Sequence, residues 1–220
     1  MTGEPTIVST GCERAWLRAC IGGELVGFIP PAVTGTVLVS TGASDLVLLV
    51  GLILAGTAEG WILGSAQQRV LHRFAPTVVG WPQATAVGAG IAWCAGMGGS
   101  MLVGEAGPIA LLVVAPSWLA GLVAMPALQQ HRLSLAGLRR THRWIPWSVV
   151  AWMFGVSVPV VALSIVPNNA PAAVHVVIAI VAAVAMGAIV GLVTGRVLQT
   201  MLRPTSRTGP PADLRLSTIW

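Results

Sequence analysis

The 220-residue sequence contains no lysine and no tyrosine, and charged residues make up only 9% of it. Soluble domains carry about 25% charged residues, because a water-facing surface needs them. With 55% hydrophobic residues and a mean hydropathy of +0.83, this chain cannot form such a surface. Intrinsic disorder is excluded as well, since it requires low hydrophobicity. The composition therefore predicts an integral membrane protein.

Residues and motifs that carry known chemistry are also scarce. The three cysteines form no CxxC pair, and the four histidines form no HExxH motif or other ligand spacing. GxSxG and GxxxxGK[ST] motifs are absent. We therefore expect no metal, no cofactor and no enzymatic activity.

Six long apolar runs dominate the sequence, and each has about the 20 residues that a membrane-spanning helix needs. The runs are Ala19–Val39, Leu46–Gln68, Ala84–Val103, Pro108–Leu128, Trp147–Val166 and Ala172–Leu198. They predict an all-α bundle of six transmembrane helices over residues 19–203. Residues 1–18 are then a cytoplasmic N-terminal segment, and residues 204–220 a flexible cytoplasmic tail.

The twelve arginines account for the formal charge of +5, and their distribution predicts an orientation. Eleven lie in the two termini and in the connections after the second and fourth runs, and Arg196 lies near the inner end of the sixth run. The other three connections contain none, which places both termini in the cytoplasm by the positive-inside rule. Because the arginines mark loops rather than one basic face, nucleic-acid binding is excluded.

Three tryptophans, Trp16, Trp81 and Trp144, stand just before the odd-numbered runs. Indole rings favour the membrane–water interface, so we expect these side chains at the cytoplasmic boundary. Aligning the tryptophans gives a threefold repeat of helical hairpins, over residues 16–71, 81–130 and 144–200.

Small residues recur at every fourth position within these hairpins. Such stripes bring helix backbones together in membranes, although they could also line a conduit. The glycines concerned are Gly23, Gly27, Gly56, Gly60, Gly64, Gly88, Gly187, Gly191 and Gly195. In the same alignment Gln68, Gln129 and Gln199 occupy the cytoplasmic ends of the even-numbered runs. They could form a polar ring at the inner mouth or be helix ends that reach the headgroups.

Two neighbouring segments resemble a group of bacterial six-span membrane proteins. Glu59 to Leu71 follows the pattern EGxxLGxxQxxVL, and Trp81 to Met97 follows WxxATxxGAxxAWxxGM. Arg143 to Trp152 is similar to the third repeat of the same group. The resemblance implies the fold but no activity. Arginine without lysine, together with abundant Ala, Val and Gly, is typical of high-GC bacteria such as actinobacteria.

Glu59 is the strongest candidate for an intramembrane site, because it lies near the middle of the second run. Charged side chains at this depth are rare and are often functional. Burial favours the uncharged acid, which could exchange a proton; alternatively, Glu59 is a structural hydrogen-bonding group. In the repeat alignment, the positions equivalent to Glu59 are Ala120 and Val190.

Glu24 and Arg196 lie at similar predicted depths in the first and last runs. We expect an ion pair between them that closes the bundle, unless each reaches the interface separately. Two functions remain open. One is a small-solute or ion carrier or channel coupled to protons. The other is a membrane scaffold or accessory subunit that binds partner helices, or a second copy, through its glycine stripes.

Overall fold

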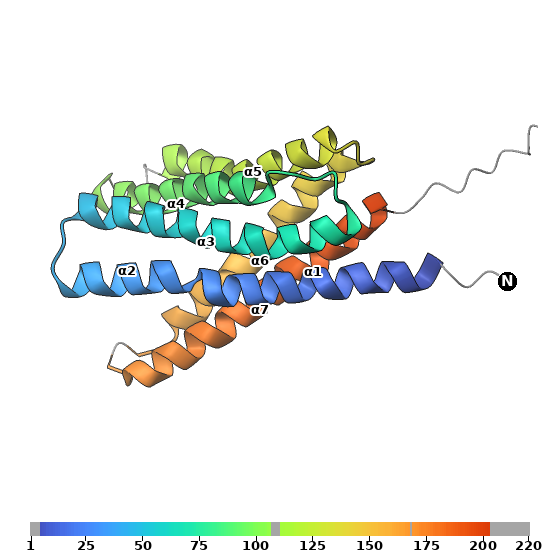
Figure 1. Cartoon of the computed structure of the whole chain (residues 1–220). Coiled ribbons are helices and arrows are strands. Elements are labelled where there is room, and N and C mark those ends of the chain that lie inside the picture. Colours follow the sequence, from blue (N-terminus) through green and yellow to red (C-terminus); the bar gives the residue numbers. More distant parts are fainter. Residues whose placement is uncertain (1–4, 107–110, 168, 203–220) are drawn as a thin grey trace, which may run out of the picture.

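The structure is a computed structural model that describes residues 5–106, 111–167 and 169–202 (Figure 1). Every regular element in these ranges is a helix, which confirms the all-α class. The α-helices are α1 (Pro5–Gly27), α2 (Ile29–Ser40), α3 (Asp45–Phe74), α4 (Trp81–Ala106), α5 (Leu111–Leu135), α6 (Trp144–Ser164) and α7 (Ala172–Leu202). The predicted tail, residues 204–220, lies outside the described residues.

The first predicted run is built from two helices that form one long rod. Pro30 and Pro31 occupy the first turn of α2, where a missing N–H costs no helical hydrogen bond. The Phe28 N–H still donates to the Glu24 carbonyl at 2.9 Å, so the chain continues in the same direction. Helix α1 begins at Pro5, well before the predicted start at Ala19.

Four helical segments of the described chain are long and apolar enough to cross a membrane. They are Gly11–Ser40, Asp45–Phe74, Thr141–Ala162 and Ala173–Leu202. Large apolar side chains on these segments face outward, including Leu54, Phe154 and Val160, each more than 60% exposed. Such surfaces are unstable in water but suit a lipid environment. Together these features support a membrane location.

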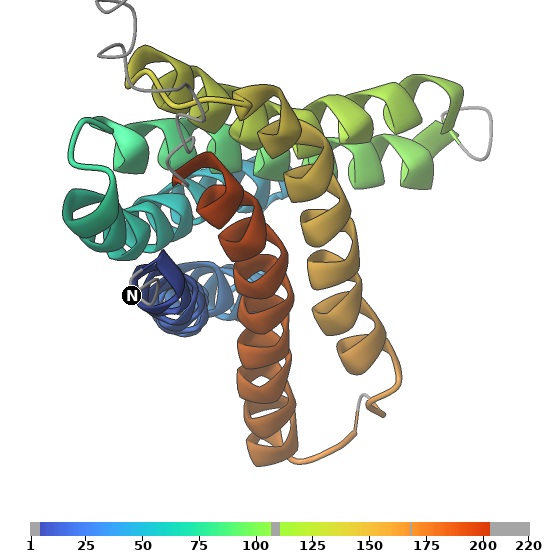
Figure 2. The same cartoon turned by 90° about the vertical axis from the view of Figure 1, so that its right-hand side faces the viewer.

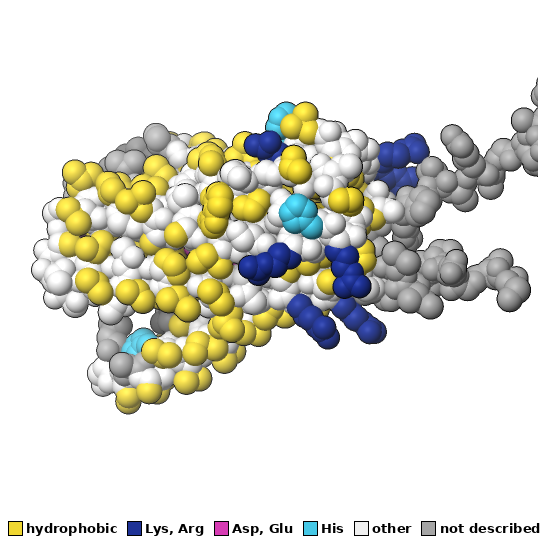
Figure 3. Space-filling view, viewed as in Figure 1, with side chains coloured by type: hydrophobic (Ala, Val, Ile, Leu, Met, Phe, Trp, Pro, Cys, Tyr) yellow, Lys and Arg dark blue, Asp and Glu magenta, His cyan; other side chains and the backbone are white. Residues whose placement is uncertain are grey.

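The helices form a closed ring. Helix α1 packs against both α3 and α7, and the other neighbours are α3 with α4, α4 with α5, α5 with α6, and α6 with α7. The helices gather at the end of the molecule near the N-terminus. Away from that end, the α6–α7 hairpin diverges from α4 and α5 (Figure 2). On the face seen in Figure 3 the arginines also lie toward the N-terminal end, while apolar side chains are spread over the rest of that face.

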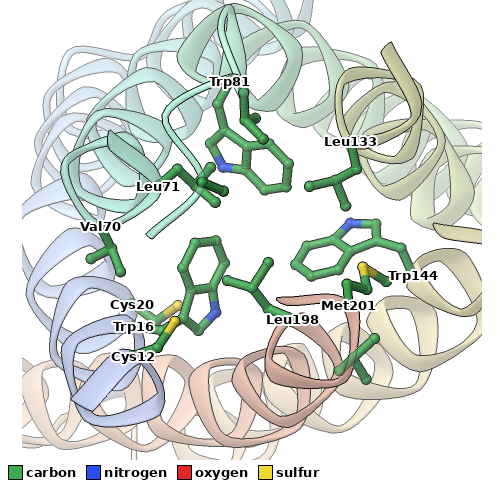
Figure 4. Packing of buried hydrophobic residues seen from close by; sticks show 13 residues of the cluster. Cys12, Trp16, Cys20, Val70, Leu71, Trp81, Leu133, Trp144, Leu198 and Met201 are labelled. Carbon is green, nitrogen blue, oxygen red and sulfur yellow. The ribbon is translucent and has the colours of Figure 1, made fainter. Parts of the chain in front are cut away.

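The main apolar core lies where the helices gather, and three fully buried tryptophans form its centre (Figure 4). Its members are Cys12, Trp16, Cys20, Val70, Leu71, Ala75, Val78, Trp81, Leu133, Trp144, Val197, Leu198 and Met201. The prediction that the three indoles lie at the lipid interface is therefore wrong. Their exposed fractions are 0%, 0% and 1%, so they pack against one another and not against headgroups.

Candidate functional site

The three tryptophans form a closed aromatic cluster at the centre of the gathered end. The ring centroids of Trp16, Trp81 and Trp144 are 5.4–6.1 Å apart, and every pair meets edge to face. In this geometry the positive edge of one ring meets the negative face of the next. Figure 4 shows the three indoles pointing toward one another from α1, α4 and α6. They fill the space between the helices at this end.

Each indole N–H in this cluster donates a hydrogen bond to a polar side chain on another helix. Trp16 bonds to Thr194 Oγ1 at 2.9 Å, Trp81 to Gln67 Oε1 at 2.8 Å, and Trp144 to Gln129 Oε1 at 3.0 Å. All three acceptors are buried. Because an unpaired polar group inside a core is costly, these bonds allow the indoles to be enclosed completely.

The amide groups of Gln67 and Gln129 also bind a third helix. Gln67 Nε2 donates to Cys20 Sγ on α1 at 3.4 Å, and Gln129 Nε2 donates to Thr85 Oγ1 on α4 at 3.0 Å. Each amide therefore joins three helices through its two polar ends, which stiffens the gathered end of the bundle.

Neither alternative for the three glutamines, a polar ring or helix ends that reach the headgroups, describes Gln68 and Gln129, because both side chains are buried. Gln68 Nε2 donates to the Val78 carbonyl, and its Oε1 accepts the N–H of Trp81, so this side chain supports the α3–α4 connection. Gln129 binds Trp144 and Thr85. Gln199 is partly buried on α7. On α3, the residue that binds an indole is Gln67, one residue before Gln68.

Glu59 lies in the interior of α3, and its partner is a fourth tryptophan. The Trp93 indole N–H on α4 donates to Glu59 Oε2 at 2.8 Å. On its other side Glu59 faces α1 at Gly27, where a Cβ would lie 3.3 Å from Glu59 Cγ and 3.2 Å from the Glu59 carbonyl oxygen. The absence of a side chain at Gly27 lets the two helices approach closely beside the carboxyl group.

Glu24 is one turn from Gly27 on α1 and is completely buried, with an exposed fraction of 0%. Neither carboxyl oxygen has a hydrogen-bond partner within the described chain. The carboxyl groups of Glu24 and Glu59 are close enough to interact electrostatically. Helices α1 and α3 therefore bring two acidic side chains together in an otherwise apolar interior.

The predicted ion pair between Glu24 and Arg196 is wrong. Arg196 Nε lies 3.5 Å from Glu13 Oε1, and its side chain is 73% exposed. Helices α1 and α7 do pack together as expected, but Gly195 faces Trp16 and Glu13. Glu13 is eleven residues before Glu24, about 16 Å along a helix at 1.5 Å per residue. The two predicted partners thus differ in depth.

All nine glycines of the predicted stripes lie against a neighbouring helix. A Cβ at any of them would fall within 4 Å of an atom of the partner helix. Gly60 is among the tightest, because its Cβ would lie 2.5 Å from Ala89 Cβ and 2.8 Å from the Thr85 carbonyl oxygen. This geometry is that of close helix packing.

An open cavity of about 680 Å³ lies between α3, α4 and α5. Leu49, Ile91, Cys94, Val114 and Gly121 are among its lining residues, and the lining is almost entirely apolar. Such a surface suits hydrocarbon rather than a polar solute. Among the described residues, no three His, Cys, Asp or Glu side chains gather as metal ligands. The two buried carboxyl groups are therefore the best candidate for a functional site.

Four side chains that form hydrogen bonds in the tryptophan cluster or with Glu59 were not predicted as site residues: Gln67, Thr85, Trp93 and Thr194. Three of them are letters of the two patterns quoted above, in which they stand among glycines and apolar residues. A polar or indole residue at a fixed place in an apolar helix needs a buried partner, and that was the available signal. Thr194 carried no such signal.

Comparison of the chain with protein-family models, with curated proteins and with solved structures finds no match. The function must therefore be argued from the geometry described above.

Proposed function

We propose that this chain is a small proton-coupled carrier or channel for an ion or small solute in the bacterial cell membrane. One observation carries the proposal: the buried Glu24 and the half-buried Glu59 interact electrostatically, inside helices that suit a membrane. Placing an acid at this depth is costly, and natural membrane proteins mostly do so where protons or ions move. Trp93 binds Glu59, and the glycines bring the helix backbones close together.

The proposal includes six spans with both termini in the cytoplasm. Helices α4 and α5 have 26 and 25 residues and are about 38 Å long at 1.5 Å per residue, longer than a hydrocarbon core of about 30 Å. The gathering of arginines near the N-terminal end supports a cytoplasmic location for that end.

A topology experiment tests this arrangement. A reporter fused after Gln199 should be active only if it is a cytoplasmic reporter, and one inserted in the 167–171 connection only if it is a periplasmic reporter. Matched pairs of both reporter types at both sites provide the control. Reversed activity at either site would contradict the proposed orientation.

The threefold repeat remains part of the proposal, and the tryptophan contacts support it. Each indole bonds to the second helix of the hairpin that precedes it around the ring. Trp16 bonds to α7, Trp81 to α3 and Trp144 to α5. Four residues after each tryptophan stands a small polar residue. These residues are Cys20, Thr85 and Ser148. The hairpins thus reuse one packing scheme.

The same contacts define which positions correspond to Glu59. It lies eight residues before Gln67, and the equivalent positions before Gln129 and Thr194 are Gly121 and Met186. These differ from Ala120 and Val190 in the sequence alignment, because the tryptophan contacts shift the register. None of them can ionise, so the carboxyl pair belongs to the first hairpin alone.

Proton flux into vesicles tests the proposed function. We expect vesicles containing the purified protein to dissipate an imposed pH gradient, as followed by a trapped pH-sensitive dye. Glu59→Gln keeps the shape and the Trp93 contact but cannot bind a proton, so it should slow the flux by about tenfold or more. Glu13→Gln is the matched control, because Glu13 lies beside Arg196 and away from the pair.

Two results would contradict the carrier. One is a flux no faster than in empty vesicles, and the other is an unchanged flux in Glu59→Gln. In the first case, recovery of the protein in a stable complex with another membrane protein would favour the scaffold function.

A further inference from the structure

The surroundings of Glu24 suit an undissociated acid. Its side chain has no exposed surface, and neither oxygen has a hydrogen-bond donor near it in the described part of the chain. A carboxylate enclosed without a donor or a cation is strongly disfavoured, whereas a neutral carboxyl group is tolerated. A neutral carboxyl group also carries an O–H that can donate to an acceptor.

Glu59 has the opposite surroundings. It is partly exposed, and its Oε2 accepts the Trp93 indole N–H at 2.8 Å. An indole nitrogen can only donate, so this bond is available to stabilise a negative charge on the carboxyl group. A proton can bind to the second oxygen of Glu59, Oε1, which does not accept this bond.

The helices packed against α1 bring no cation to Glu24. Helix α3 contributes Glu59, and the Cys20 thiol lies one turn away on α1 itself. Arg196 of α7 lies on Glu13, and His175 is at the far end of that helix. Helix α2 contains no titratable residue. The charge balance at the site is therefore set by the two carboxyl groups.

We infer that Glu24 and Glu59 hold one proton between them at neutral pH, with Glu24 as the undissociated acid and Glu59 as the carboxylate that binds and releases a second proton. The inference rests on the proposed function and identifies its proton site. Two carboxyl groups that interact in an apolar interior each disfavour the ionisation of the other, so they titrate as one pair. The step consists only of binding a proton to Glu59 Oε1 and losing it again.

Infrared spectroscopy of the purified protein in vesicles tests the pair, because a neutral carboxyl group has its own C=O absorption. At neutral pH the wild-type protein should show one such band, and mild acidification, to a pH at which ordinary exposed carboxyl groups stay ionised, should add a second. Glu24→Gln should remove the first band. Glu59→Gln should keep the first band and remove the second, and Glu13→Gln should keep both.

The absence of a neutral carboxyl band at neutral pH, or its persistence in Glu24→Gln, would overturn the inference. If Glu24→Gln does not fold, Glu59→Gln decides alone: a second band that still appears on acidification would refute the assignment. The spectra do not depend on transport. Intact bands without proton flux would contradict the carrier only, and flux without these bands would contradict the pair only.

Discussion

Replacement of Trp81 by alanine is expected to lower the free energy of unfolding by about 3–5 kcal/mol, the usual cost of removing a buried tryptophan. The indole of Trp81 has an exposed fraction of 0% and touches both other rings of the cluster. Its removal also leaves Gln67 Oε1 without its donor inside a closed core. Both the lost packing and the unpaired acceptor lower the free energy of unfolding. Circular dichroism during denaturation of the detergent-solubilised protein measures the change.

The matched control for this change is Trp147→Ala on α6. Trp147 is 52% exposed and lies outside the cluster, so its loss should cost much less. Equal stability losses in the two variants would show that the aromatic cluster is not a centre of stability.

Gly60→Leu is expected to prevent assembly of α3 with α4. Even a single Cβ at this position would meet Ala89 Cβ at 2.5 Å and the Cα of Ala86 at 3.0 Å, and backbone atoms cannot move aside as a side chain can. Overpacking by one or two methylene groups usually costs about 1–3 kcal/mol, and a leucine adds more volume than that. We therefore expect little or no folded protein, measured as the monodisperse fraction in size-exclusion chromatography.

Gly98→Leu provides the control on α4. A Cβ at Gly98 meets no atom within 4 Å, so a leucine there faces open space. Because both variants introduce the same side chain into an apolar helix, helix propensity and hydrophobicity are matched. A folded yield of Gly60→Leu close to that of Gly98→Leu would contradict the role of Gly60 as a close contact.

Much of the helical architecture could be predicted from hydropathy alone. In the part of the chain that the structure describes, the six apolar runs lie mainly in helices, because a strongly apolar chain has few alternatives in lipid. The predicted helix ends were less accurate. Helix α3 continues to Phe74 and α1 begins at Pro5, because a helix can continue through residues that are not apolar.

The direction in which a side chain faces was harder to predict than its depth. Trp16, Trp81 and Trp144 stand where interfacial tryptophans are common, yet they point inward, because polar partners on other helices accept their N–H groups. Two of those partners are 14 and 15 residues from their tryptophans, and the third is 178 residues away. Hydropathy gives the position of a residue along the membrane normal, but only packing determines its rotation about the helix axis.

The error at Glu24 has a different cause, because here the depth itself was wrong. Arg196 lies beside Glu13, which is eleven residues and about 16 Å along α1 from Glu24. A correct neighbour helix therefore does not ensure a correct partner. Glu59, in contrast, was identified because it is the single acid in the second apolar run, although the sequence left open whether it exchanges a proton or is a structural hydrogen-bonding group.

The bond from Trp16 to Thr194 joins residues 178 positions apart and has a consequence for biogenesis. Helix α1 leaves the ribosome first and α7 last, yet the two pack side by side. In a membrane, the α7-facing side of α1 would meet only lipid until the final hairpin inserts, and the Trp16 indole would lack its acceptor. The ring of helices can close only after α7 has been made, which would leave the partly synthesised chain open to capture by chaperones or proteases until then.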